Sequence, residues 1–216
     1  MKKLWLCLPL LVLSYFTIGT MSFAADDGKN TSRSLYFREP PQELAGLATT
    51  QLADLEKGSA LSDEEANSTR KLVGELDLTK PATLKALKDG LHRSGSAAIA
   101  IIQELMESQD DETRKKAVFA LRCTLDSSKN LPKENTVADS LSATLLHRSI
   151  YDRKPDVRRS AMVGLRNLAI SRSGKVRSAA LGALQEGLND PDVDLRQFAE
   201  ECCRAAEPAS SDSDAQ

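Results

Sequence analysis

The chain has 216 residues, with 29 basic and 31 acidic side chains and a formal net charge of −2 at pH 7. Alanine, leucine and charged residues dominate, aromatic residues make up only 4%, and no run of alternating apolar and polar residues is long enough for a sheet. This composition excludes a protein built on β-sheets and predicts a single all-α domain.

The first predicted element is an export signal at residues 1–24. Lys2 and Lys3 form a short basic start, an apolar run spans Leu4 to Ile18, and Ser22-Phe23-Ala24 places small residues at the two positions that a signal peptidase recognises. The apolar run is shorter than the roughly 20 residues that a membrane-spanning helix needs. We therefore expect cleavage after Ala24 and a soluble periplasmic or secreted protein, although retention of the signal as an anchor stays open.

Residues 25–39 are small, polar and charged, which predicts a flexible leader before Pro40-Pro41. We expect the folded domain at residues 40–206 and a disordered acidic tail at residues 207–216. Caps and apolar spacing predict the helices between them, beginning with a capping box at Ser62-Asp63-Glu64-Glu65. The expected helices are 44–55, 62–76, 81–92, 97–107, 111–125, 134–151, 155–170, 175–188 and 191–206.

A pattern recurs four times on these helices: an apolar residue or Thr, then Arg, then Ala three positions after the Arg, then an apolar residue four positions later. The arginines are Arg114, Arg158, Arg177 and Arg196, and successive copies begin 44, 19 and 19 residues apart. This spacing fits one helix plus a short loop, so the sequence predicts helix hairpins at 97–125, 134–170 and 175–206 that stack as a solenoid.

The positive charge of an arginine in the first turn of a helix opposes the helix dipole, so a nearby carboxylate should compensate it. Four aspartates lie within three residues of the pattern starts: Asp111, Asp156, Asp192 and Asp194. Because bidentate arginine–carboxylate pairs join adjacent loops well, we expect the repeated arginines to be structural.

Two strings within the pattern resemble HEAT repeats, in the short bacterial form whose helices begin with Asp-Pro, then Val-Arg and Ala. They are Lys154-Pro155-Asp156-Val157-Arg158-Arg159-Ser160-Ala161, and Asp190-Pro191-Asp192-Val193 leading to Leu195-Arg196. The resemblance covers residues 97–206 and, by helical pattern alone, residues 42–92. It implies a right-handed α–α superhelix that serves as a binding scaffold. A few relatives are chromophore lyases or DNA glycosylases, but their functional residues match no position here.

Motifs for catalysis or cofactor binding are nearly absent, and we expect no catalytic residue, no cofactor and no metal. The two histidines, His92 and His147, lie on different predicted hairpins. Asp190, Asp192, Asp194 and Glu201 match positions 1, 3, 5 and 12 of a calcium loop, but Leu195 stands where the loop requires glycine. Helix capping explains these acidic residues better.

Three cysteines, Cys123, Cys202 and Cys203, remain after signal cleavage. The helix of Cys123 lies two repeats from the other two, so we expect no disulfide between them. Cys203 takes the core position that Leu165 and Leu184 occupy in their helices, which predicts a buried thiol there.

Charge is distributed unevenly along the chain. Residues 148–177 contain nine basic and two acidic side chains, whereas residues 186–216 contain nine acidic and two basic ones. Either the basic stretch is a solvated face, or its members outside the repeated arginines form a binding site for an acidic protein, an anionic envelope polymer or lipid headgroups. The candidates are Arg153, Lys154, Arg159, Arg166, Arg172 and Lys175.

The sequence therefore predicts an exported HEAT-like scaffold that binds a protein with an acidic surface, and not nucleic acid. Two alternatives stay open: an inhibitor or immunity-type protein that occludes an exported enzyme, and a HEAT-like enzyme of the lyase or glycosylase kind.

Overall fold

The computed structural model describes residues 34–56, 62–127 and 137–207, and this part of the chain is all-helical, without a strand. The predicted export signal, the leader up to residue 33 and the tail from residue 208 lie outside the described residues. Each predicted helix has a counterpart. The helices are α1 (Gln42–Glu56), α2 (Asp63–Gly74), α3 (Pro81–Ser94), η1 (Gly95–Ala97), α4 (Ala98–Met106), α5 (Asp111–Ser127), α6 (Val137–Ser149), α7 (Pro155–Ser171), α8 (Gly174–Gly187) and α9 (Val193–Ala206).

Local sequence signals set the helix ends. The predicted capping box is confirmed at α2, where the backbone N–H of Glu65 donates to Ser62 Oγ over 3.3 Å and the backbone N–H of Ser62 donates to Glu65 Oε2 over 3.0 Å. Prolines fit the first turns of α3 and α7, where a backbone N–H has no partner within the helix. Gly95 ends α3 with a φ of 57°, a conformation that glycine adopts without strain.

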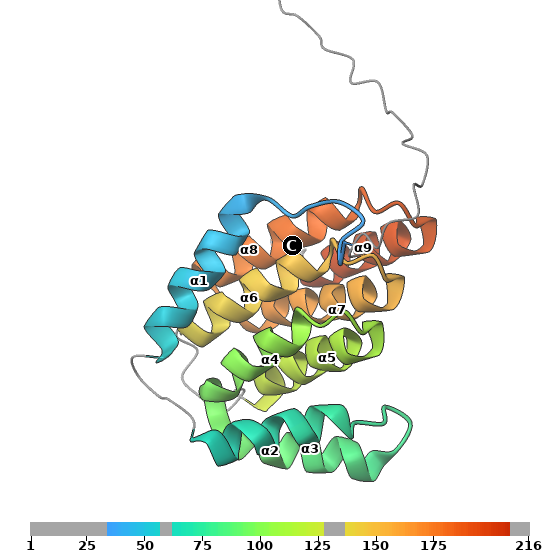
Figure 1. Cartoon of the computed structure of the whole chain (residues 1–216). Coiled ribbons are helices and arrows are strands. Elements are labelled where there is room, and N and C mark those ends of the chain that lie inside the picture. The colour runs from blue at the N-terminus through green and yellow to red at the C-terminus, as the bar shows by residue number, and fades with distance from the viewer. Residues whose placement is uncertain (1–33, 57–61, 128–136, 208–216) are drawn as a thin grey trace, which may run out of the picture. The chain divides into compact units, whose positions relative to one another are not determined.

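The helices pair into hairpins α2/α3, α4/α5, α6/α7 and α8/α9, and each hairpin packs against the next. Figure 1 shows them following one another from α2 and α3 at the bottom to α8 and α9 at the top. Helices α3, α5, α7 and α9 form one layer, which we call the second-helix layer. A continuous apolar core lies between the layers and includes Leu121, Leu165 and Leu184, whose side chains are fully buried.

Helix α1 departs from this order, because it packs against α6 although α2 to α5 separate the two in sequence (Figure 1). Ala48 is fully buried in α1, and Thr144 Oγ1 on α6 donates to Gln51 Oε1 over 2.9 Å. In a solenoid each hairpin contacts only its neighbours, and α1 departs from that arrangement.

Residues 34–39, which we call the strap, also differ from expectation. The strap lies against the loop between α6 and α7. The N–H of Phe37 donates to the carbonyl of Tyr151 over 3.0 Å, and the N–H of Arg153 donates to the carbonyl of Leu35 over 2.8 Å. The sequence analysis predicted a flexible leader up to Glu39. Its last residues are ordered instead, because backbone hydrogen bonds and aromatic contacts hold them.

Buried arginine–aspartate pairs, which we call rungs, join successive hairpins in the second-helix layer. Arg114 on α5 donates from Nε and Nη2 to the two carboxylate oxygens of Asp152, over 2.6 and 3.1 Å. Its Nη1 donates to the carbonyls of Ser108 and Gln109 in its own hairpin. With side chains 1% and 4% exposed, the pair is shielded from solvent.

The second rung repeats this geometry one hairpin later. Arg158 on α7 donates from Nε and Nη2 to the carboxylate of Asp190, over 2.7 and 2.8 Å, and from Nη1 to the carbonyls of Asp152 and Arg153. Each arginine therefore binds the loop before its own helix and the aspartate of the next hairpin. These contacts align the starts of α5, α7 and α9.

The structure corrects the expected partners of the four repeated arginines. The carboxylates come mainly from the next hairpin and not from within three residues, although Asp111 also accepts from Arg114 over 2.7 Å. Arg177 donates to the carbonyl of Ala206, and Arg196 donates only to carbonyls before its own helix. Asp156, a nominated partner, instead pairs with Lys115 over 3.1 Å.

Candidate functional site

Arg159 and Arg166, two of the six nominated residues, lie two turns apart on α7 and face the same side of the helix. Neither has a hydrogen bond or ion pair with any described residue, and Arg166 Nε is buried without an acceptor. The guanidinium of Arg159 stands over the ring of Phe198 on α9, 4.3 Å from the ring centre. Arg159 is exposed and Arg166 is half-buried.

A groove of about 350 Å³ continues from Arg159 toward α5. It is lined by Leu78, Lys115, Phe119, Arg122, Asp156, Arg159, Ser160 and Val163. Arg122 stands over the ring of Phe119, 5.2 Å from its centre, and donates to Ser160 Oγ over 3.2 Å. The walls thus combine apolar surface with guanidinium groups supported by aromatic rings. We call Phe119, Arg159, Val163, Arg166 and Phe198 together the arginine face.

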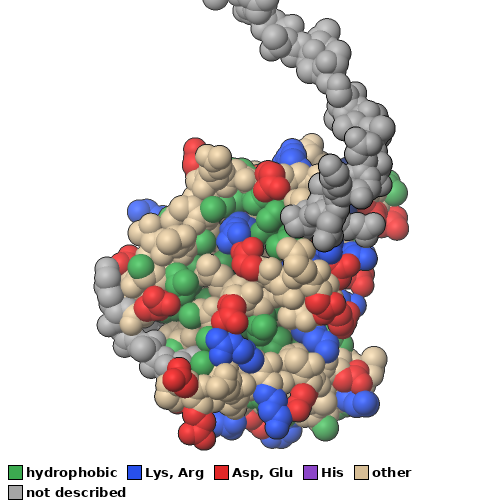
Figure 2. All heavy atoms as spheres, in the orientation of Figure 1, with side chains coloured by type: hydrophobic (Ala, Val, Ile, Leu, Met, Phe, Trp, Pro, Cys, Tyr) green, Lys and Arg blue, Asp and Glu red, His purple; other side chains and the backbone are tan. Residues whose placement is uncertain are grey.

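The side turned toward the viewer in Figure 1 shows basic and acidic side chains interspersed (Figure 2).

Two further nominated residues, Arg153 and Lys154, lie in the loop before α7 and share an internal partner. Arg153 donates from Nε and Nη2 to Asp111 Oδ1 over 3.1 and 2.8 Å, and Lys154 Nζ lies 2.9 Å from Asp111 Oδ2. Partial burial raises the pKa of Asp111, but the hydrogen bonds from Lys154, Arg153 and Arg114 outweigh it and hold this pKa well below its usual range. These basic side chains support the loop.

The last two nominated residues lie apart from the arginine face. Arg172, expected to be exposed, is buried against Asp139, with Nε 3.0 Å from Oδ2 and side chains 7% and 6% exposed. It therefore anchors the C-terminal end of α7. Lys175 is exposed in the first turn of α8. Of the six nominated residues, only Arg159 and Arg166 belong to the arginine face.

The cysteines near the arginine face are poor nucleophiles. Cys202, which is 1% exposed, takes the core position expected of Cys203, which is only partly buried. Burial raises the pKa of the Cys202 thiol to about 11, against the opposing effect of the Arg166 and Arg159 charges. The buried Cys123 is on α5. Helices α5 and α9 each pack against α7, so α7 lies between Cys123 and the other two cysteines.

A second cluster of titratable groups links α6 to α8 beneath the strap. Glu186 Oε2 lies 3.0 Å from His147 Nε2 and accepts a hydrogen bond from the Tyr151 hydroxyl. Burial raises the pKa of Glu186, but these two contacts outweigh it and lower the pKa below its usual value. The guanidinium of Arg38 on the strap stands 5.0 Å from the centre of the Tyr151 ring. These groups contact one another and, through Tyr151, the strap, so their role is structural.

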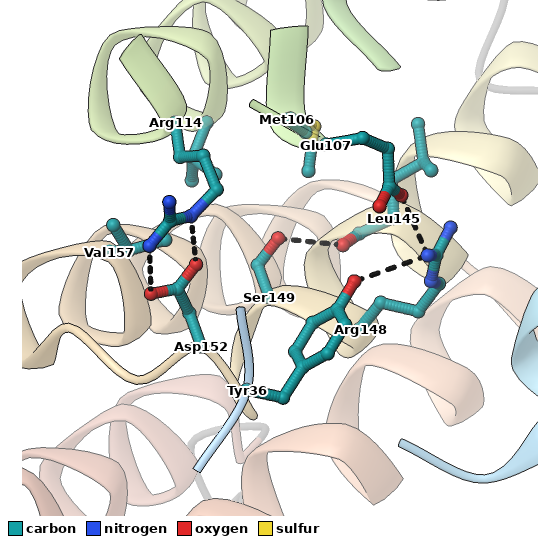
Figure 3. Close-up of a pocket in the computed structure, with 10 residues that line it drawn as sticks. Tyr36, Met106, Glu107, Arg114, Leu145, Arg148, Ser149, Asp152 and Val157 are labelled. Carbon is teal, nitrogen blue, oxygen red and sulfur yellow. Dashed lines mark hydrogen bonds and ion pairs between the residues drawn. The ribbon is translucent and has the colours of Figure 1, made fainter. Parts of the chain in front are cut away.

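The strap also closes a small cavity, shown in Figure 3. Tyr36 extends toward Arg148, whose Nη2 donates to the tyrosine hydroxyl over 3.1 Å and to Glu107 Oε1 over 2.7 Å. Burial raises the pKa of Tyr36, against the opposing effect of Arg148. The cavity holds about 10 Å³, enough for one water molecule and too little for an organic ligand.

Two acidic residues of the candidate calcium loop, Asp190 and Asp192, have structural roles. Asp190 forms the second rung, and Asp192 caps α9 by accepting from the N–H of Asp194 over 2.9 Å. The capping interpretation of Asp192 is confirmed. Among the described residues, no three His, Cys, Asp or Glu side chains are placed to share a metal ion. None of the described helices has the length and apolar character that crossing a membrane requires.

Comparisons of the chain with protein-family models, curated proteins and solved structures found no match.

The sequence analysis missed the aromatic half of the arginine face. Phe119 and Phe198 support arginines that lie in the same helix or one hairpin away. The sequence contained a signal for Phe198. This residue follows Arg196 by two positions, as Ser160 follows Arg158, so Phe198 and Ser160 take equivalent places on their helices.

Proposed function

We propose that the chain is an exported HEAT-like repeat protein, a right-handed α–α superhelix of hairpins that acts as a scaffold and binds a protein partner with an acidic surface. Support for the family comes from the two strings around Arg158 and Arg196, and from the equivalent roles that Arg114 and Arg158 play in joining hairpins. Support for export comes from residues 1–24.

One observation carries the binding role: Arg159 and Arg166 have no hydrogen bond or ion pair with a described residue, whereas Arg153, Lys154 and Arg172 form ion pairs within the chain. A charged side chain that merely keeps a protein soluble needs no fixed position. Arg159 is held against an aromatic ring, and Arg166 places a donor where water does not reach. Both properties suit recognition of an anionic group.

We propose binding rather than catalysis because the titratable groups with perturbed pKa values serve internal contacts. Glu186 and Tyr151 hold the strap, Asp111 holds the loop before α7, and the Cys202 thiol stays protonated. A catalytic acid or base needs access to a substrate, and a thiol nucleophile needs a lowered pKa.

An affinity capture from envelope extract tests the scaffold role. The tagged wild-type chain should retain a protein in stoichiometric amount, and a variant with Arg159→Glu and Arg166→Glu should lose it. The Lys175→Glu variant is the control, because Lys175 is exposed like Arg159 but lies on α8, outside the arginine face. Circular dichroism should show unchanged helix content in all variants. If the wild-type chain retains no protein, the proposed function is wrong.

The export proposal has its own test. Mass spectrometry of the protein made in a bacterial host should show a chain that begins at Ala25 and is recovered from the periplasm or medium. Recovery of the full-length chain from the cytoplasm would contradict export.

A further inference from the structure

We propose that the arginine face binds an acidic helix of the partner, with one carboxylate on Arg159 and a second, two helical turns further along, on Arg166. This inference rests on the proposed function, that the chain binds a protein, and specifies the segment that it binds. The argument uses the spacing of the two arginines, the support of each guanidinium and the shape of the adjoining groove.

The spacing favours a helical partner. Arg159 and Arg166 are seven residues apart on α7, which places them about 10.5 Å apart along the helix axis. A second helix packed along α7 presents its own residues i and i+7 on one side with the same separation. Two glutamates at that spacing therefore meet both arginines at once.

Arg159 is already held in a conformation suited to a carboxylate. Its guanidinium lies over the Phe198 ring, so the flat face is occupied and the N–H groups at the edge have no acceptor among the described residues. The edge is the part that forms two parallel hydrogen bonds with a carboxylate. Because the ring restricts the side chain before binding, less conformational freedom is lost when the partner arrives.

Arg166 supplies the second contact. Its Nε is buried and donates to no described residue, although a buried donor without an acceptor is destabilising. Burial raises the pKa of the Cys202 thiol and the charges of Arg166 and Arg159 both lower it, which shows that both side chains lie near α9. The Arg166 side chain as a whole is only half-buried, so a partner carboxylate can reach its outer nitrogens and pair with the guanidinium.

The groove gives the partner an apolar anchor beside the charged contacts. Leu78, Phe119 and Val163 contribute apolar surface to a volume of about 350 Å³, which has room for a leucine or phenylalanine side chain. Lys115 and Asp156 on its walls neutralise one another over 3.1 Å. A helix that carries an apolar residue between its two glutamates therefore matches both the charge and the shape of this face.

A titration of the full chain with a fluorescein-labelled helical peptide tests the proposal by fluorescence anisotropy. The 18-residue peptide is rich in alanine and glutamine, with glutamates at its positions 6 and 13 and leucine at position 10. One control peptide has glutamine at both glutamate positions. A second control has glutamates at positions 6 and 11, which point in different directions from the helix.

We expect saturable binding of the first peptide and at least about tenfold weaker binding of both controls, the size of effect that a charge-assisted pair gives. Arg159→Gln and Arg166→Gln should each weaken binding about tenfold, whereas Lys175→Gln should change it less than about twofold. Each arginine variant should lose its effect when the facing glutamate is already glutamine. Should Arg166→Gln fail to fold, Arg166→Lys keeps the charge but removes the fork geometry and should still weaken binding.

Three outcomes would overturn the inference: equal binding of all three peptides, no binding up to about 1 mM, or binding that both arginine variants leave unchanged. Tighter binding of a 20-nucleotide single-stranded DNA, lost in the arginine variants, would also overturn it and assign the face to nucleic acid. Its failure differs from that of the proposed function, because a captured partner that the arginine variants still retain would contradict only this inference.

Discussion

The hairpins from α4 to α9 and the first hairpin, α2/α3, are held in different ways. The later hairpins share a continuous apolar core and two buried rungs, Arg114–Asp152 and Arg158–Asp190. The first hairpin also buries apolar side chains, but its polar contacts with the next hairpin lie at the surface. Arg70 pairs with Glu104, with side chains 38% and 57% exposed, and Lys116 Nζ donates to the carbonyl of Gly74 over 2.9 Å.

The comparison separates what packing provides from what rungs provide. Apolar burial holds all the hairpins together, but it tolerates small shifts of one helix along another. A bidentate pair with both partners buried tolerates none, because a shift would leave a charge without its partner. We therefore expect the later hairpins to keep a fixed register and the first hairpin to open more readily in local unfolding.

Removing one partner of a rung should have the largest effect. Asp152→Ala removes the bidentate, buried partner of Arg114 and leaves only the single contact with Asp111, so it should lower the free energy of unfolding by about 3–5 kcal/mol. Urea denaturation followed by circular dichroism measures the change. Asp156→Ala is the matched control, because this aspartate has a side chain 71% exposed and pairs with Lys115 at the surface.

Replacing both partners of the same rung sharpens the comparison. A variant with Arg114→Met and Asp152→Leu removes both buried charges and should be more stable than Asp152→Ala alone. If the double variant is as unstable as the single one, the rung contributes stability through its hydrogen bonds rather than through charge compensation.

A cavity in the later hairpins should destabilise a larger part of the molecule than a cavity in the first hairpin. Leu165→Ala creates a cavity at a fully buried position on α7 and should cost about 2–5 kcal/mol in the same denaturation assay. Leu87→Ala does the same on α3. Hydrogen exchange should show loss of protection throughout the later hairpins for the first variant and mainly in α2 and α3 for the second. Equal spread in both variants would contradict the distinction.

Acid should weaken the loop that supports α7. The folded pKa of Asp111 is held below its unfolded value of about 3.9, so its contribution is present above that pH and is lost as the pH falls through the folded pKa. Between pH 5 and pH 2, the urea midpoint of the wild type should therefore fall further than that of Asp111→Asn. Parallel pH profiles for the two proteins would show that Asp111 contributes nothing.

The smallest effect is expected at the contact between the first two hairpins. Arg70→Gln removes a solvent-exposed ion pair with Glu104 and should leave the extrapolated stability within the roughly 10–15% uncertainty of the urea method. A loss comparable to that of Asp152→Ala would mean that exposed and buried pairs hold the hairpins equally well.

Sequence reasoning predicted the helices well because their signals are local. The Ser62–Glu65 capping box, the prolines in first turns and Gly95 each act within a few residues of the helix end that they determine. Spacing was also enough to find the repeated arginines. In the candidate site, it nominated Arg159 and Arg166, which the structure places on one side of α7.

The partners of those arginines could not be predicted in the same way, because they depend on how hairpins stack. Asp152 and Asp190 each stand six positions before a repeated arginine, a regularity visible in the sequence, but the arginine that each one binds belongs to the preceding hairpin. The strap was missed for a related reason. Leu35 and Phe37 were grouped with a polar leader, and only the fold brings them to the loop before α7.

The rungs also make the protein's length adjustable. Asp152 and Asp190 are separated by 38 residues, as are Arg158 and Arg196. A tandem duplication of residues 152–189 would give Arg158 the aspartate of the inserted copy, while the inserted arginine would take Asp190. Every rung would be kept and one would be added, without a change at any other position. Gene duplication or deliberate design can thus extend this protein one hairpin at a time.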